Sequence, residues 1–232
     1  MDTISQAIAA ALRLILTGNA DLLSAVATSL SVSVTATAIA GLLGAPLGAW
    51  IAMRNFPGRP TAIVIVNALL GVPSVVVGLI VYLLLSRSGP LGGLGLLFTT
   101  QAMIIAQTLL TLPIVVALTH RATQGHWKEF GDALAIDGAS PGRCVLTLLA
   151  MARWALATVA LAAFGRAIAE VGAVMIVGGN IRDHTRTMTT AIALETSKGD
   201  LALAMGLGLI LVALMLVVSV VTFELARRSE LN

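Results

Sequence analysis

The sequence predicts an all-α membrane protein with five core transmembrane helices and one further helix at the N-terminus. The chain has 232 residues, of which 58% are hydrophobic and only 11% are charged. A typical soluble domain carries about 25% charged residues, so a water-soluble globule of this composition would lack the polar side chains to cover its surface. The apolar stretches are continuous rather than alternating at every second residue, which excludes a transmembrane β-barrel. The protein therefore belongs in a lipid bilayer.

Long stretches without Asp, Glu, Lys or Arg mark the candidate spans, and they lie at residues 22–53, 60–86, 88–120 and 201–223. A transmembrane helix needs about 20 mostly apolar residues, so each stretch holds one crossing. Another apolar segment runs from Cys144 toward residue 181 and is interrupted by Arg153, Arg166 and Glu170. We expect a transmembrane domain at residues 22–226, with core helices at 27–53, 61–86, 97–119, 146–172 and 202–225.

The N-terminal segment, residues 1–18, differs from these spans. Ile4, Ile8, Leu12 and Ile15 recur at helical spacing, whereas polar residues occupy the other faces. The segment is too short and too polar to cross a bilayer comfortably. We therefore expect an interfacial helix that lies along the membrane surface.

The distribution of Lys and Arg predicts the orientation, because cytoplasmic loops are enriched in these residues. A cytoplasmic C-terminus places the larger group of cations inside: Arg54, Arg59, Arg121, Lys128, Arg143, Arg227 and Arg228. The opposite side then carries Arg87, Arg182, Arg186 and Lys198, with Arg13 near the N-terminus. The sequence thus predicts a multi-pass protein of a cell membrane with its C-terminus in the cytoplasm.

Three prolines fall one apiece in the first three core spans, at Pro46, Pro73 and Pro113. Each removes a backbone donor and is expected to bend or break its helix. Such bends often serve packing alone, because proline and glycine are common in membrane helices. The alternative is that the bent helices line or gate a pathway, so the three prolines are candidate gate residues.

Arg166 and Glu170 are candidate pathway residues. They are four positions apart and would share one face of a continuous helix, where they could form an ion pair. Ionisable groups at membrane depth are costly and usually face a bundle interior or a water-filled cavity. Arg166 would then shape the field along a pathway for an anion, with Glu170 holding its side chain. A self-neutralising structural pair is the alternative.

The loop at residues 121–143 is the longest expected cytoplasmic connection. Its middle predicts a short amphipathic helix, with Phe130 and Leu134 on one side and Asp132 on another. Gly138 is placed to end this helix in the left-handed conformation. A solvated connector is one interpretation, but a helix projecting from the membrane also suits docking of a soluble partner.

Several kinds of site are not indicated by the sequence. It contains no phosphate-binding loop for ATP and no pairing of nucleophile and base, so we expect neither a cofactor nor catalysis. His126 with Glu129 and Asp132 is the nearest approach to a metal site, and we disfavour it. The net charge of +3 is too small and too scattered for nucleic-acid binding. A transporter of this kind is either passive or draws energy from a partner.

The stretch Asp132-Ala133-Leu134, followed by Gly138, resembles the EAA loop of ABC-importer permeases. Asp132 stands where glutamate is usual, and the following TLLAMAR lacks the proline of the family pattern. Further segments resemble the tungstate-type (TupB) permeases of the molybdate, tungstate and sulfate group: FPGRP, LLGVPSVVVGLIVYLLLSRSGPLG, AMIIAQTLLTLPIV, FGRAIAEVGAVMIVGGNI and TRTMTTAIALET. The likeness covers most of the chain from about residue 28.

This resemblance implies a type I ABC-importer permease fold and an ATP-driven import function rather than an enzymatic one. It implies a homodimer in the lipid of a prokaryotic inner membrane, two cytoplasmic ATPase subunits that bind the ATP, and a periplasmic or lipid-anchored oxyanion-binding protein. The coupling residues would be Glu129, Asp132, Ala133, Leu134 and Gly138. Tungstate is the favoured substrate. Molybdate or sulfate import is the alternative within the class, and a passive channel, secondary carrier or scaffold is disfavoured.

The predicted orientation is open to a labelling test. Cysteines introduced at His126 and His184 should react from opposite sides of the membrane, because an odd number of crossings separates them in the expected topology. The measurement is labelling by a membrane-impermeant thiol reagent in intact cells and in inverted vesicles. Labelling of both positions from the same side would contradict the orientation.

Overall fold

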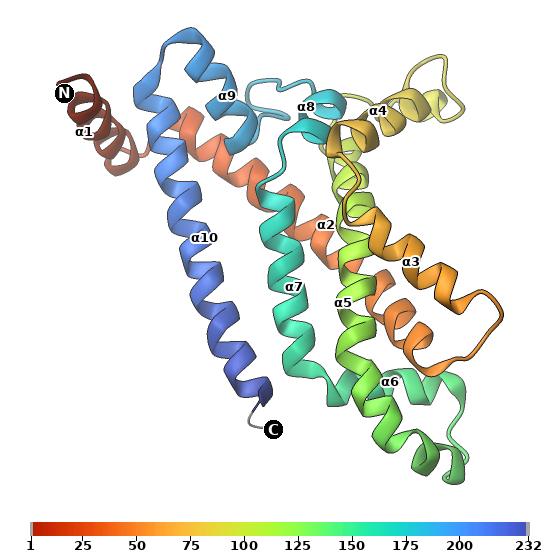
Figure 1. Cartoon of the computed structure of the whole chain (residues 1–232). Coiled ribbons are helices and arrows are strands. Elements are labelled where there is room, and N and C mark those ends of the chain that lie inside the picture. The colour runs from red at the N-terminus through yellow and green to blue at the C-terminus, as the bar shows by residue number, and fades with distance from the viewer. Residues whose placement is uncertain (1, 231–232) are drawn as a thin grey trace. The chain divides into compact units, whose positions relative to one another are not determined.

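The computed structural model describes residues 2–230, which form helices joined by short turns (Figure 1). No strand occurs in this part of the chain, in agreement with the predicted all-α class. Met1, the first residue of the expected segment 1–18, lies outside it. Two compact units, taken separately below, divide the chain: unit 1 is Met1–Ala36, Pro73–Gln107 and Ala167–Val218, and unit 2 is Thr37–Val72, Thr108–Arg166 and Ser219–Asn232.

Among the described residues, three single helices are long and apolar enough to cross a membrane. They are α2 (Ala20–Met53), α5 (Thr100–Ile136) and α10 (Leu201–Glu230). Two pairs of shorter, bent helices pass the same test of length and composition together, each as one broken span or as a re-entrant loop. Counted as one span each, they bring the described chain to five candidate spans, which is the number expected. The pairs are α3 (Arg59–Leu69) with α4 (Ser74–Leu85), and α6 (Pro141–Met151) with α7 (Arg153–Ile168).

The expected single helix at 61–86 is wrong, because the chain breaks between α3 and α4. Pro73 is the N-cap residue of α4, with φ −59° and ψ 127°. Proline has no N–H to continue a helix and disfavours helical geometry at the residue before it. The turn ahead of it is closed by the Gly71 N–H, which donates to the Ala68 carbonyl at 3.1 Å.

The other two candidate gate prolines behave differently. Pro46 lies inside α2 and Pro113 inside α5, and both helices continue through them. Only Pro73, of these three, coincides with a break. Within long membrane helices, neighbouring turns and side chains can satisfy the backbone groups that a proline leaves without partners.

The expected helix end near residue 119 is also wrong. Helix α5 continues to Ile136, so the predicted amphipathic helix is the last part of α5 rather than a separate element. No proline lies between residues 119 and 136, so every residue there keeps its backbone N–H donor. The Thr123 hydroxyl donates to the Thr119 carbonyl within the same helix at 2.8 Å. Sequence reasoning placed the boundary where the apolar composition ends, although a helix can extend beyond the hydrocarbon into water.

The expected helix at 146–172 consists of two helices in unit 2 that meet at a bend of 80°. Ala152 separates them with φ −85° and ψ 14°. The bend leaves Arg153 exposed, with its guanidinium 5.7 Å from the centre of the Trp154 ring. Helix α7 then ends at Ile168, earlier than expected.

Besides α4, unit 1 contains three more short α-helices, of which only the first was expected: α1 (Asp2–Leu16), α8 (Gly172–Gly178) and α9 (Met188–Lys198). Ala11 of α1 is fully buried, and Gly206 of α10 approaches both Ala11 and Leu22. This contact fixes α1 within unit 1. Its position relative to a membrane stays a prediction.

Helices α4 and α8 pack closely in unit 1 because glycine is present at the contact. A Cβ atom at Gly78 would lie 2.7 Å from the Ala173 Cα, and one at Gly172 would lie 2.7 Å from a methyl carbon of Val75. Such distances are shorter than any normal carbon–carbon contact. A side chain at either glycine position would therefore force the two helices apart.

In unit 2, glycines likewise allow α2 and α5 to pack closely. A Cβ at Gly48 would lie 2.6 Å from the Val116 carbonyl oxygen, and one at Gly44 would lie 3.0 Å from the side chain of Val115. Val115 is buried with Ala40, Val159 and Ala163 in an apolar cluster that joins α2, α5 and α7. Small residues thus allow close helix packing here as well.

The close approach of α4 to α8 predicts a sharp difference between two glycines. Gly78→Ala should destabilise the protein by about 1–3 kcal/mol, because the added methyl group overpacks the contact with Ala173. Gly208→Ala, in α10, is the matched control, since a Cβ there meets nothing within 4 Å. Thermal unfolding in detergent would measure both. Equal melting temperatures for the two variants would contradict this account of the contact.

Candidate functional site

The candidate coupling segment, residues 121–143, comprises the end of α5, a turn and the start of α6. Gly138 has φ +67°, the left-handed conformation that was predicted for it. Its N–H donates to the Ala135 carbonyl at 3.1 Å, and the Ala139 N–H donates to the Leu134 carbonyl at 3.0 Å. These two bonds form a Schellman motif, which satisfies the last carbonyl groups of α5 and reverses the chain.

The turn is anchored on its inner side. Leu134 and Ala139 pack against a buried cluster of Met53, Cys144 and Leu148 within unit 2. An apolar contact between these two positions is the usual companion of this motif. The turn is therefore a fixed structure and not a loose connector.

Helix α6 begins directly after the turn. The Ser140 hydroxyl accepts a hydrogen bond from the Arg143 N–H at 3.4 Å, and Pro141 occupies the first helical position. Serine is a preferred N-cap, and proline there costs no hydrogen bond. Pro141 thus starts the next helix.

The outer side of the coupling segment is exposed. Glu129, Asp132, Ala133 and Gly138 all face solvent, and Leu134 is half-buried. The structure therefore brings the five predicted coupling residues together along one helix end and its turn. Ile136 was not predicted as a site residue, yet it lies 86% exposed at the tip. A large apolar side chain in this position suits a protein contact.

Arg166 and Glu170 do not lie on one continuous helix. Helix α7 ends at Ile168, so Glu170 lies beyond it, in the connection to α8. The expected geometry, four residues apart on one continuous helix, is therefore wrong. Arg166 is half-buried in the last turn of α7, and Glu170 is buried.

Glu170 has a structural role within unit 1. Its carboxylate accepts a hydrogen bond from the Ala173 N–H at 3.0 Å, in the first turn of α8. Its own carbonyl accepts from the Thr189 hydroxyl at 2.7 Å. Nearby, the Gln107 amide donates to the Ala167 carbonyl at 3.0 Å, where α7 ends. Buried side chains thus satisfy the backbone groups that the helix break exposes.

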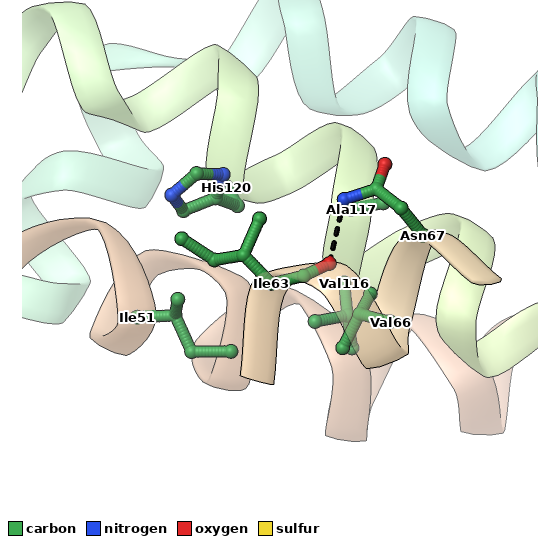
Figure 2. A pocket seen from close by; sticks show the side chains of 7 residues that line it. All are labelled: Ile51, Ile63, Val66, Asn67, Val116, Ala117 and His120. Carbon is green, nitrogen blue, oxygen red and sulfur yellow. Dashed lines mark hydrogen bonds between the residues drawn. The ribbon is translucent and has the colours of Figure 1, made fainter. Parts of the chain in front are cut away.

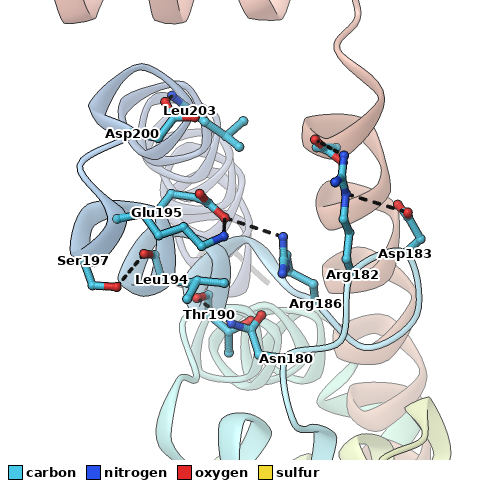
Figure 3. A network of polar contacts seen from close by, with 12 residues as sticks. Asn180, Arg182, Asp183, Arg186, Thr190, Leu194, Glu195, Ser197, Asp200 and Leu203 are labelled. Atoms are coloured by element: carbon cyan, nitrogen blue, oxygen red, sulfur yellow. Dashed lines mark hydrogen bonds and ion pairs between the residues drawn. The ribbon is translucent and has the colours of Figure 1, made fainter.

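A charged network in unit 1, which sequence reasoning did not single out, surrounds α9 (Figure 3). Glu195 is buried, and its carboxylate Oε1 lies 3.5 Å from the Arg186 Nη1 and 3.0 Å from the Lys198 Nζ. Arg182 forms a two-pronged hydrogen bond with Asp21, at 2.7 Å on both arms. This contact raises the pKa of the Arg182 guanidinium above its ordinary value. The network fixes the α8–α9 connection against the start of α2.

In unit 2, polar side chains connect α3 to α5 around a small apolar pocket (Figure 2). The Asn67 amide donates to the Ile63 carbonyl at 2.7 Å and accepts from Arg121 at 2.9 Å. His120 and Val116 border the same pocket. The pocket is too small for an oxyanion and is best understood as a packing detail. No group of His, Cys, Asp and Glu residues in the described chain is arranged to hold a metal ion.

Long and broken apolar helices, a polar and structured turn between two of them, and buried ionisable groups at a helix break define the class. The chain is the membrane-embedded permease component of a transport system. It belongs to the family of binding-protein-dependent transport system inner membrane components, whose family model matches residues 44–230.

Three relatives illustrate the family. A probable anion ABC transporter permease of Haloferax volcanii is 44% identical over 203 residues, which cover 85% of this chain and 88% of that protein. The tungstate uptake system permease TupB of Peptoclostridium acidaminophilum is 38% identical over 225 residues, covering 97% and 99%. The sulfate transport permease CysW of Escherichia coli is 30% identical over 182 residues, covering 75% and 62%.

The role of Glu170 at the helix break generates a stability prediction. Glu170→Ala should lower the free energy of unfolding by about 1–3 kcal/mol, because the Ala173 N–H loses its buried acceptor. Glu129→Ala, at an exposed position of α5, should leave the melting temperature unchanged. Thermal unfolding of both variants in detergent measures the difference. A Glu170→Ala protein as stable as the wild type would contradict the capping role.

Proposed function

We propose that this chain is the translocation subunit of an ATP-driven ABC importer for an oxyanion, with tungstate as the favoured substrate. The observation that carries the proposal is the coupling segment: an exposed helix end and turn, fixed from behind by packing and by the left-handed Gly138. A permease that binds no ATP itself needs a rigid contact of this kind with a separate ATPase.

Coupling would use the exposed face of this segment. Glu129, Asp132, Ala133 and Gly138 would contact a cleft of the ATPase subunit, with Leu134 and its packing supporting them from inside. ATP-driven closure of two ATPase subunits would then move the two segments of a permease homodimer. Because α5 runs without a break from residue 100 to residue 136, a displacement at its end is carried along the whole helix.

The substrate assignment draws on the names of the relatives, which include a tungstate uptake permease and a probable anion permease. Tungstate and molybdate are tetrahedral dianions of nearly the same size and charge, and sulfate has the same shape. A separate binding protein, periplasmic or lipid-anchored, would therefore make most of the selection before delivery. Molybdate or sulfate import is the alternative within the class.

Arg166 is the proposed pathway cation. It lies at the end of α7, directly before the connection that Glu170 helps to hold. In this proposal Glu170 holds the Arg166 side chain, and its bond to the Ala173 N–H also fixes the backbone of the connection. Pro46, Pro73 and Pro113 keep a proposed role in the gate, for which the break at Pro73 is the favourable observation.

The experiment is ATP-driven uptake by the complex purified from its native membrane and reconstituted into vesicles. Radioactive tungstate should accumulate only with ATP on the ATPase side, and unlabelled molybdate should compete better than sulfate. Gly138→Val should lower ATP-driven uptake at least tenfold while leaving membrane insertion intact, because a β-branched residue cannot easily adopt a positive φ.

Gly199→Val is the matched control for Gly138→Val. Gly199 also has a positive φ, at +84°, but it ends α9 and lies outside the coupling segment. Normal uptake by the Gly138→Val protein would refute the coupling role. Uptake that continues without ATPase subunits would instead support a passive channel or secondary carrier.

A further inference from the structure

A polar pocket of about 300 Å³ opens beside the coupling segment, within unit 2. One wall comes from the end of α2 and the turn that leads to α3, and the other comes from α5. Its polar and aromatic lining consists of Asn55, Arg59, Gln124, Trp127, Lys128 and Asp132. Because Asp132 belongs to both the pocket and the coupling segment, a protein bound at one would reach the other.

The positively charged side chains that line the pocket outnumber the negatively charged ones. Arg59 is held by the end of α2, where its Nε donates to the Ile51 carbonyl at 2.9 Å and its Nη2 to the Ala52 carbonyl at 3.3 Å. Carbonyl groups fix the guanidinium in place without cancelling its charge. Lys128 is exposed and forms no ion pair in the described part of the chain. Two cations thus face the single acid Asp132.

The aromatic wall of the pocket depends on a glycine. A Cβ atom at Gly131 would lie 3.1 Å from a ring carbon of Trp127, which is closer than normal packing allows. The absence of that atom allows the indole ring to lie against α5. The pocket therefore combines a fixed cation, an exposed cation and a flat apolar wall, an arrangement that suits the carboxylate and the methylene groups of an acidic side chain.

We propose that this pocket receives an acidic side chain of the ATPase subunit, as a second contact beside the tip at Gly138. The inference rests on the proposed function, since it requires an ATPase partner. It adds to that function the charged groups through which the ATPase would be recognised. Asp132 suits a cation of the partner, and Arg59 with Lys128 suits a neighbouring anion. Charges of both signs within one pocket would fix the register in which the partner docks.

Charge reversal at Lys128 tests the proposal in the native complex, which is purified in detergent through a tag on the permease. Lys128→Glu should weaken association with the co-purifying ATPase about tenfold or more, because like charges then meet in the pocket. The readouts are the ATP hydrolysis recovered per permease and its dependence on salt. Lys128→Gln should give a smaller loss, and its complex should be less sensitive to salt than the wild type.

Arg227→Glu is the matched control. Arg227 is an exposed cation at the end of α10, is predicted to lie on the same side of the membrane, and does not line the pocket. Its reversal changes the net charge equally and should leave the complex intact. Loss of ATPase with both reversals would indicate a general charge effect and overturn the proposal.

The remaining outcomes separate the pocket from the proposed function. If Lys128→Glu keeps its ATPase while Gly138→Val loses it, the pocket contact is wrong and the coupling segment stands. If neither variant loses its ATPase, the pocket contact and the coupling role of the segment are both wrong. If Lys128→Glu matters only in vesicles of anionic phospholipid, and not in lipid-free detergent, the pocket binds a lipid headgroup and the inference is overturned.

Discussion

A helix that breaks within the hydrocarbon of a bilayer must find hydrogen-bond partners for its backbone inside the protein, and this constraint organises the structure. An exposed N–H or C=O in hydrocarbon costs several kcal/mol, so every break in an apolar helix needs a local solution. Glu170 provides one for the first turn of α8. Ser29 provides another, because its hydroxyl accepts the Met188 N–H at 2.7 Å where α9 begins. Arg59 does the same for the carbonyls at the end of α2.

These caps explain how charged and hydroxyl side chains occur in such an apolar chain. Burying a carboxylate such as that of Glu170 costs free energy unless its oxygens accept hydrogen bonds. The bond from the Ala173 N–H offsets part of that cost. The same reasoning covers the threonines around α9, where the Thr187 and Thr190 side chains close a capping box. A buried polar residue in this protein is therefore first a structural element, and a pathway role requires a further argument.

The sequence predicts the spans well and their interruptions poorly. Composition indicates the candidate spans, since four stretches of sufficient length carry no charge and a fifth is interrupted by Arg153, Arg166 and Glu170. Gly138 could be placed because helices commonly end on a left-handed glycine. Pro73 and Pro46 look alike in the sequence, yet only the first coincides with a break. The end of α7 at Ile168 depends on distant partners such as Gln107, which one-dimensional patterns do not reveal. The cap made by Arg59, a residue close to α2 in sequence, depends on how the intervening turn folds. The exposed helix end and the turn at Gly138 were therefore predictable from the sequence, whereas the role of Glu170 was not.

The close contact of α4 with α8 has a mechanical consequence. Where Gly78 meets Ala173 the two backbones approach closely, and the Ala173 methyl group beside the contact has no rotamers to rearrange. Packed surfaces of this kind separate or stay joined but do not slide gradually. These two helices should therefore travel as a single rigid piece during a transport cycle. Any flexibility that transport requires must then come from elsewhere, and the bend at Ala152, where no such closely packed glycine lies, is a natural hinge.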